Sequence, residues 1–144
     1  VFSLELARQY GYLYQQTDKE FLILHSLDGF DEISLTGSFK FYSNKGEKVM
    51  SPRELGLAQL TLSEIKGGDT VENSAKLFMQ ILEGKGTPQQ NAVVIANAGM
   101  ALYCANQSTS IVQSIGRAAE SLKSGKALDC FKRLLNTWFH FQIF

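Results

Sequence analysis

The sequence predicts one α/β domain over residues 1–144. We expect a layered mixed sheet that consists of a buried strand and a hairpin, and several helices that cover this sheet. Three observations predict this class. An uninterrupted apolar run, Phe21 to Leu24, is typical of a buried strand. Residues 39–49 alternate in side-chain character, as strands do. The second half of the chain repeats apolar residues at helical spacing, and 144 residues with 44% hydrophobic content suffice for one core.

The first half contains one expected helix and all the expected strands. Apolar residues share one helical face over residues 3–15, and this helix should end near Gly11 or soon after. The strand of residues 21–25 follows. The pattern then becomes β-like from residue 33 to residue 50, and the residues 43–46 have the composition of a hairpin turn.

The second half is expected to be helical. Ser51, Pro52 and Glu54 form a helix start, and Asp69 or Thr70 can cap the next helix, which ends at Gly84. Residues 91–105 are apolar nearly all round, which predicts a central, buried helix. Two more helices are expected, one after residue 108 and one after residue 125, the latter running into the aromatic segment 138–141.

Charge and cysteine content exclude some classes of function. Fourteen basic residues balance fourteen acidic ones, so no overall field attracts nucleic acid or an anionic membrane. No apolar stretch is long enough to cross a bilayer. Cys104 and Cys130 lack metal-ligand spacing, and we expect both to be buried thiols in a reducing compartment. The sequence thus predicts a soluble, cytoplasmic protein.

The most informative segment follows the predicted strand. It places three carboxylates, Asp28, Asp31 and Glu32, within five residues. Adjacent Asp31 and Glu32 are hard oxygen ligands of the kind that magnesium takes alongside waters and substrate phosphates, although such a pair also occurs in solvated loops and helix caps. We expect Asp28 to organise the turn, and His25 to fix the loop rather than to act as a general base.

Two other segments could bind phosphate. Glycines precede a helix at residues 67–70, where backbone N–H groups can face an anion, but Asp69 can fill that position itself as a capping carboxylate. Basic residues Lys45, Lys48 and Arg53 gather near the hairpin, where charge also protects an edge strand from pairing with other molecules. Capping and edge protection are the favoured interpretations.

The acidic segment also carries a resemblance. Residues 25–34 (HSLDGFDEIS) resemble the metal-binding signature of the anthranilate phosphoribosyltransferase family, with Ser26 where the family more often has glycine. Further similar motifs lie at residues 54–57, 67–73, 81–84, 97–98 and 124–127, so the resemblance covers nearly the whole chain apart from the aromatic segment. The resemblance implies the C-terminal α/β domain of a nucleoside phosphorylase/phosphoribosyltransferase-like fold. Because the chain opens on Val1 without a methionine, we expect it to be cut from a longer polypeptide.

The resemblance implies a function for the longer protein. The family uses Mg²⁺ to transfer a phosphoribosyl group from phosphoribosyl pyrophosphate to anthranilate in tryptophan biosynthesis. Asp31 would hold one magnesium ion, and Glu32 would contact that ion and a second one. The pyrophosphate loop, the other substrate-binding residues and the helical region that forms the homodimer would lie upstream. We therefore expect no catalytic or substrate-binding residue in residues 1–144, no activity of this piece alone, and exposed apolar surface where the upstream part packs.

Two alternatives remain open at this stage. A divergent domain of the same fold could serve as a non-catalytic binding module. A pyrimidine nucleoside phosphorylase shares the architecture and also uses a phosphate site, although the run of residues 28–32 favours the anthranilate branch.

Overall fold

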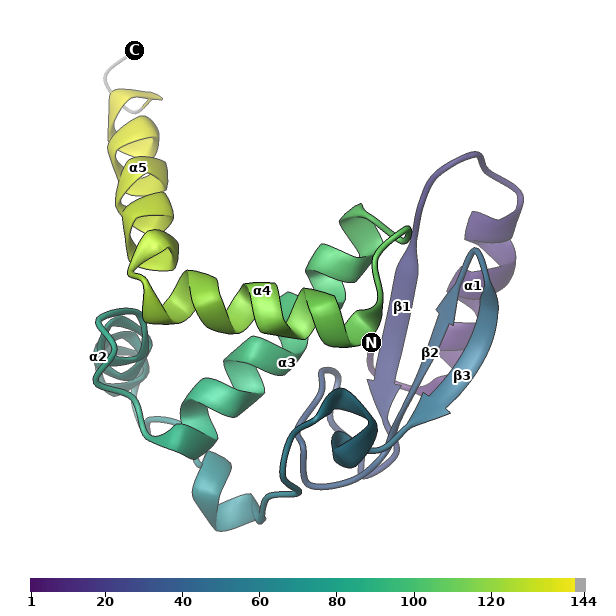
Figure 1. Cartoon of the computed structure of the whole chain (residues 1–144), viewed down its shortest axis with the longest axis horizontal. Helices are drawn as coiled ribbons and strands as arrows, with labels where there is room; N and C mark the ends of the chain where they lie inside the picture. The colour runs from purple at the N-terminus through teal and green to yellow at the C-terminus, as the bar shows by residue number, and fades with distance from the viewer. Residues whose placement is uncertain (142–144) are drawn as a thin grey trace.

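The computed structural model describes residues 1–141, and for residues 138–141 only the backbone. Its centre is a sheet of three strands, β1 (Leu22–Ser26), β2 (Phe39–Ser43) and β3 (Gly46–Met50), in the order β1-β2-β3. Helix α1 (Leu4–Gln15) lies on one side of the sheet, and α3 (Pro88–Ala105) and α4 (Ile111–Lys123) lie on the other (Figure 1). The α/β class and the hairpin are confirmed.

Both strand pairs are antiparallel, so the sheet of the described residues is not the mixed sheet that the sequence predicts. The β-like region also begins later than expected, at Phe39 instead of residue 33. Residues 34 and 36 donate side-chain hydrogen bonds to Asp28, and Leu35 has a positive φ of 63°. Side-chain bonds of this kind offer the backbone an alternative to a ladder, which explains why residues 33–38 form a loop.

Helix α1 begins at the cap Ser3, whose hydroxyl accepts a hydrogen bond from the Leu6 N–H at 3.2 Å. The helix ends at Gln15, which confirms the predicted range of residues 3–15, and Gly11 lies inside it. A Cβ on Gly11 would lie only 3.3 Å from the ring of Tyr42 on β2. Gly11 therefore lets the helix approach the sheet closely instead of ending the helix.

The main core lies between the sheet and the pair α3–α4. It is built from Ile33, Leu35, Phe39, Phe41, Met50, Leu55, Ala96, Met100 and Ile115. Phe39 and Phe41 stack with their ring centroids 6.2 Å apart, as expected for sheet packing. Helix α3 is central but not buried all round, because Val94, Ala98 and Ala101 face outward.

Two short 3₁₀ helices connect the sheet to the helical half, η1 (Pro52–Leu55) and η2 (Leu62–Ile65). The helix start predicted at Ser51 is present but short. The carboxylate of Glu54 accepts from both the N–H and the hydroxyl of Ser51, at 2.8 and 3.0 Å. These bonds are the main reason why the pKa of Glu54 lies below its ordinary value of 4.5.

Helices α2 (Val71–Leu82) and α5 (Lys126–Phe141) lie at the end away from the sheet, and α5 projects from the body (Figure 1). They meet through Phe78 and Phe131, whose rings pack edge to face with centroids 4.9 Å apart. Helix α2 is capped by Thr70, which accepts from the Asn73 N–H at 3.1 Å, while Asp69 pairs with Lys66 at 3.2 Å. Capping is confirmed at this glycine-rich segment, with Thr70 and not Asp69 as the cap. The side chains of the aromatic segment 138–141 lie outside the described residues.

None of the helices in the described part of the chain is long and apolar enough to cross a membrane.

The two cysteines differ from the expected buried pair. Cys104 is half-buried, and burial raises the pKa of its thiol, whereas Cys130 on α5 is exposed. Because the thiolate is the reactive form, iodoacetamide at pH 8 should alkylate Cys130 about tenfold faster than Cys104. Peptide mass spectrometry over a time course measures both rates, with urea-unfolded protein as the control in which the difference disappears. Equal rates in the folded chain would contradict the burial of Cys104.

Candidate functional site

The acidic segment forms a loop, residues 27–38, between β1 and β2, which we call the acidic loop. Its first turn closes on Ser26, whose carbonyl accepts from the Gly29 N–H at 3.1 Å and whose N–H donates to the Phe30 carbonyl at 3.0 Å. Gly29 has a φ of +98°, a conformation that other residues rarely adopt. The base of the loop is closed by the Leu27 N–H, which donates to the Ser38 carbonyl at 2.8 Å. The acidic loop is thus a tightly bonded turn.

Asp28 lies inside this loop and organises it, as the sequence predicts. Its carboxylate accepts hydrogen bonds from the hydroxyls of Ser34, at 3.1 Å, and Thr36. The hydroxyl oxygens of Thr36 and Ser34 lie 2.8 Å apart, so both hydroxyls meet at this carboxylate. Because its oxygens are occupied by the loop itself, Asp28 serves structure rather than a ligand.

Asp31 and Glu32 are different, because both carboxylates are exposed and no side chain in residues 1–137 bonds to either. Both residues line a pocket of about 470 Å³, together with Gly29, Phe30, Ile33, Ser34, Ile65 and Val93. No group of three or more His, Cys, Asp or Glu side chains that could hold a metal ion is present among the described residues. The pair offers oxygen ligands to a cation that completes its shell from other sources, as Mg²⁺ does with water and phosphate.

Hydrogen bonds hold the backbone beside these two carboxylates at two successive residues. The Glu32 carbonyl accepts from the Ser26 hydroxyl at 2.7 Å. Asn97 of α3 bonds the next residue, Ile33, with both ends of its side-chain amide. Sequence reasoning missed this support, since it saw Ser26 only as a departure from glycine and Asn97 only as part of a similar motif.

His25 bonds a residue outside the acidic loop. Its Nδ1 lies 2.7 Å from the Val1 carbonyl, in the segment before α1. The side chain is 8% exposed, and its bonded nitrogen faces Val1 instead of the pocket. The role of His25 in fixing the acidic loop therefore stays a prediction.

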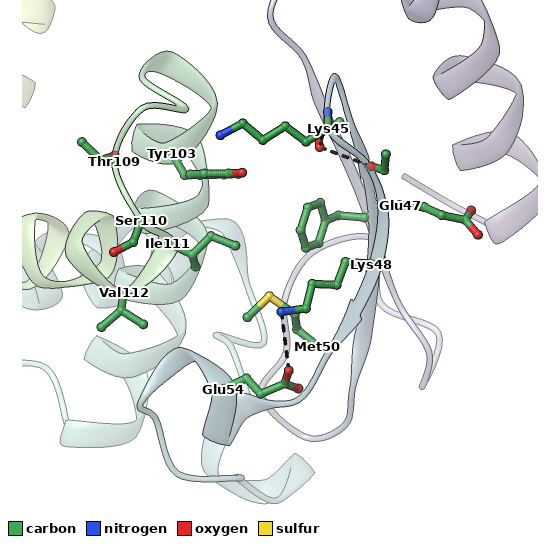
Figure 2. Close-up of a pocket in the computed structure, with 13 residues that line it drawn as sticks. Lys45, Glu47, Lys48, Met50, Glu54, Tyr103, Thr109, Ser110, Ile111 and Val112 are labelled. Carbon is green, nitrogen blue, oxygen red and sulfur yellow. Dashed lines mark hydrogen bonds and ion pairs between the residues drawn. The ribbon is translucent and has the colours of Figure 1, made fainter.

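A second pocket, of about 650 Å³, lies between the hairpin and the helices α3 and α4 (Figure 2). Lys45 donates to the Gln107 carbonyl and lies 5.5 Å from the centroid of the Tyr103 ring. Lys48 lies 3.7 Å from the carboxylate of Glu54. Arg53 does not line this pocket, so the three basic residues do not converge on one point, and both lysines already have partners. This arrangement agrees with the charged-edge interpretation.

The fold and the acidic loop define a class of protein. The model of the "Glycosyl transferase family, a/b domain" matches residues 1–128, and the chain therefore belongs to this family. Its similarity to anthranilate phosphoribosyltransferases, expected from the acidic segment, is confirmed: the enzyme of Christiangramia forsetii is 54% identical over 134 residues. That match covers 93% of this chain, and the chain spans about 40% of the length of this relative.

Solved structures agree with this similarity. The crystal structure of anthranilate phosphoribosyltransferase from Thermus thermophilus matches with a TM-score of 0.83 and 28% identity, over 92% of this chain and 40% of that one. A variant of the Saccharomyces cerevisiae enzyme with Mg bound matches with a TM-score of 0.74 and 27% identity, over 90% of this chain and 39% of that one.

Proposed function

We propose that this chain forms the magnesium-binding side of the active site of an anthranilate phosphoribosyltransferase. Such an enzyme transfers the phosphoribosyl group of phosphoribosyl pyrophosphate to the amine of anthranilate, releases pyrophosphate, and serves tryptophan biosynthesis in the cytoplasm. The observation that carries the proposal is the pair of exposed carboxylates of Asp31 and Glu32. No side chain of residues 1–137 bonds to them, and the backbone beside them is fixed at Glu32 and Ile33. The Mg-bound yeast variant and the 54% identical relative support it.

The proposed site fits a divalent cation in the donors that it offers. Asp31 would hold one magnesium ion, and Glu32 would contact that ion and a second one. Bound magnesium would stabilise the negative charge that develops on departing pyrophosphate. The backbone beside both ligands is fixed before substrate arrives. Neither carboxylate has to break a bond to another side chain of residues 1–137 in order to bind an ion. Two carboxylates alone should bind magnesium weakly, because this ion usually takes substrate phosphates as well.

The remaining parts of the active site belong, in this proposal, to the region of the relatives that this chain does not match. That region would bind phosphoribosyl pyrophosphate and anthranilate and would form a homodimer. The surface of this chain has apolar residues that such a region could cover, because Phe2 is 78% exposed and Val71 is 81% exposed. Tyr12 and Leu13 on α1 are exposed as well. The 144 residues by themselves should therefore not catalyse the transfer.

A chimeric enzyme tests this proposal. In the Christiangramia forsetii relative, the matched 40% is replaced by the 134 matched residues of this chain, which supply the acidic loop to a complete enzyme. We expect phosphoribosyl transfer within about tenfold of that of the unmodified relative, measured as magnesium-dependent loss of anthranilate fluorescence. The 144-residue chain, assayed alone at the same concentration, should be inactive.

Either of two results would overturn this proposal. A chimera that folds, as judged by its melting temperature, but does not transfer the phosphoribosyl group would leave a binding module of the same fold. Activity of the 144-residue chain alone would mean that the substrate site lies within these residues and not in the region outside the match.

A further inference from the structure

The backbone of the acidic loop is fixed from α3 by one side chain. The Ile33 N–H donates to Asn97 Oδ1 at 2.9 Å, and Asn97 Nδ2 donates to the Ile33 carbonyl, also at 2.9 Å. Asn97 Nδ2 makes a second bond, to the Val93 carbonyl one turn earlier on α3, at 3.0 Å. Both backbone groups of Ile33 are thus bonded by a side chain 64 positions away in the sequence.

These three bonds require an amide. Asn97 must present an acceptor to an N–H and a donor to two carbonyls, and a side-chain amide carries one group of each kind on the same carbon. A carboxylate at this position would face two carbonyl oxygens with a negative charge. An alkyl side chain would leave the N–H and the carbonyl of Ile33 without the partner that Asn97 provides. Because the amide is bonded at both of its ends, its orientation is fixed.

Ile33 directly follows Glu32, and its side chain is 1% exposed in the main core. On the N-terminal side of Ile33, the Glu32 carbonyl accepts a hydrogen bond from the Ser26 hydroxyl at 2.7 Å. The peptide between Glu32 and Ile33 is therefore bonded at both of its polar groups, to β1 through Ser26 and to α3 through Asn97. This fixes the direction in which the neighbouring side chains leave the backbone, while no side chain of residues 1–137 bonds to the two carboxylates.

We propose that Asn97 is a positioning residue for the cation site, which acts by holding the Glu32–Ile33 peptide so that Asp31 and Glu32 point at one ion. The inference rests on the proposed function, because it takes these two carboxylates as the ligands. It goes beyond that proposal because it states that a residue of α3 fixes the backbone beside the two ligands. Outer-shell hydrogen bonds to the ligands themselves commonly contribute about 10–100-fold to metal affinity, and a bond to the backbone beside a ligand should lie at the low end of this range.

The test uses the 144-residue chain and Mn²⁺ as a paramagnetic substitute for Mg²⁺, with binding followed by electron paramagnetic resonance. We expect the substitution Asn97→Ala to weaken Mn²⁺ binding about tenfold, and Ser26→Ala to weaken it by a smaller factor. The Ile33 amide should also exchange hydrogen faster in Asn97→Ala without metal. The matched control is Asn91→Ala, on the same helix, where the side chain bonds only the Gly86 carbonyl and does not contact the acidic loop.

The outcomes separate this inference from the function on which it rests. If Mn²⁺ binding survives the change of Asp31 and Glu32 to their amides, the ion sits elsewhere, and both proposals fail together. If those changes abolish binding but Asn97→Ala binds Mn²⁺ as tightly as the unmodified chain, only the positioning role is wrong. A lower melting temperature in Asn97→Ala with unchanged Mn²⁺ affinity would likewise reduce Asn97 to a structural residue.

Discussion

Replacing both exposed carboxylates, by Asp31→Asn together with Glu32→Gln, should lower kcat/KM of the chimeric enzyme about a thousandfold. The substitutions keep the size of both side chains and remove the charge that holds a cation against the leaving group. Loss of a single preorganised charge-stabilising group costs about 10²–10³ in rate, so the loss of both ligands should reach the upper end of that range. A thousandfold corresponds to about 4 kcal/mol of activation free energy.

The free energy of unfolding of this double variant should not change, although its activity falls. Neither carboxylate bonds to another side chain of residues 1–137, so the free energy of unfolding should stay within about 0.5 kcal/mol. The matched control is Asp18→Asn with Glu20→Gln, which makes the same change of charge at two exposed residues before β1 and should leave kcat/KM unchanged. A loss of less than tenfold, or an equal loss in the control, would remove Asp31 and Glu32 from the proposed site.

Local pattern predicted most elements of the fold, because the signals for helices and turns lie within a few residues. The hairpin turn at residues 43–46 and the cap at Thr70 are of this kind. Gly11 shows the limit of such reasoning. The predicted helix over residues 3–15 is confirmed, but the need for a glycine inside it depends on Tyr42, 31 positions later in the sequence, whose ring would lie 3.3 Å from a Cβ on Gly11.

The candidate site was predictable in its ligands but not in its support. Asp31 and Glu32 are adjacent, and their residue types alone predict oxygen ligands for a cation. Asn97 acts across 64 positions through hydrogen bonds to the backbone of Ile33, which no local pattern can reveal. The antiparallel register of β1 and β2, which places Ser26 opposite Phe39, likewise depends on contacts between distant segments.

Phe39 should be the most costly single truncation in the core, and Phe39→Ala should lower the free energy of unfolding by about 3–5 kcal/mol. Its ring is 0% exposed at the start of β2, where it packs in the same cluster as Ile33, Met50 and Ile115. Removing it leaves a cavity between the sheet and the helices, which the paired strands on either side cannot collapse to fill. Since the free energy of unfolding of a protein domain is about 5–15 kcal/mol, this loss is a large fraction of the total stability.

Urea unfolding measures this loss as a lower midpoint with an unchanged slope. The control is Leu62→Ala, a truncation of an apolar side chain that is 64% exposed, which should stay within about 0.5 kcal/mol. Because Ile33 shares the core cluster with Phe39, Phe39→Ala should also speed hydrogen exchange at the Ile33 amide, which connects the core to the acidic loop. A destabilisation below about 1.5 kcal/mol would mean that the core relaxes around the missing ring, and that the acidic loop does not depend on it.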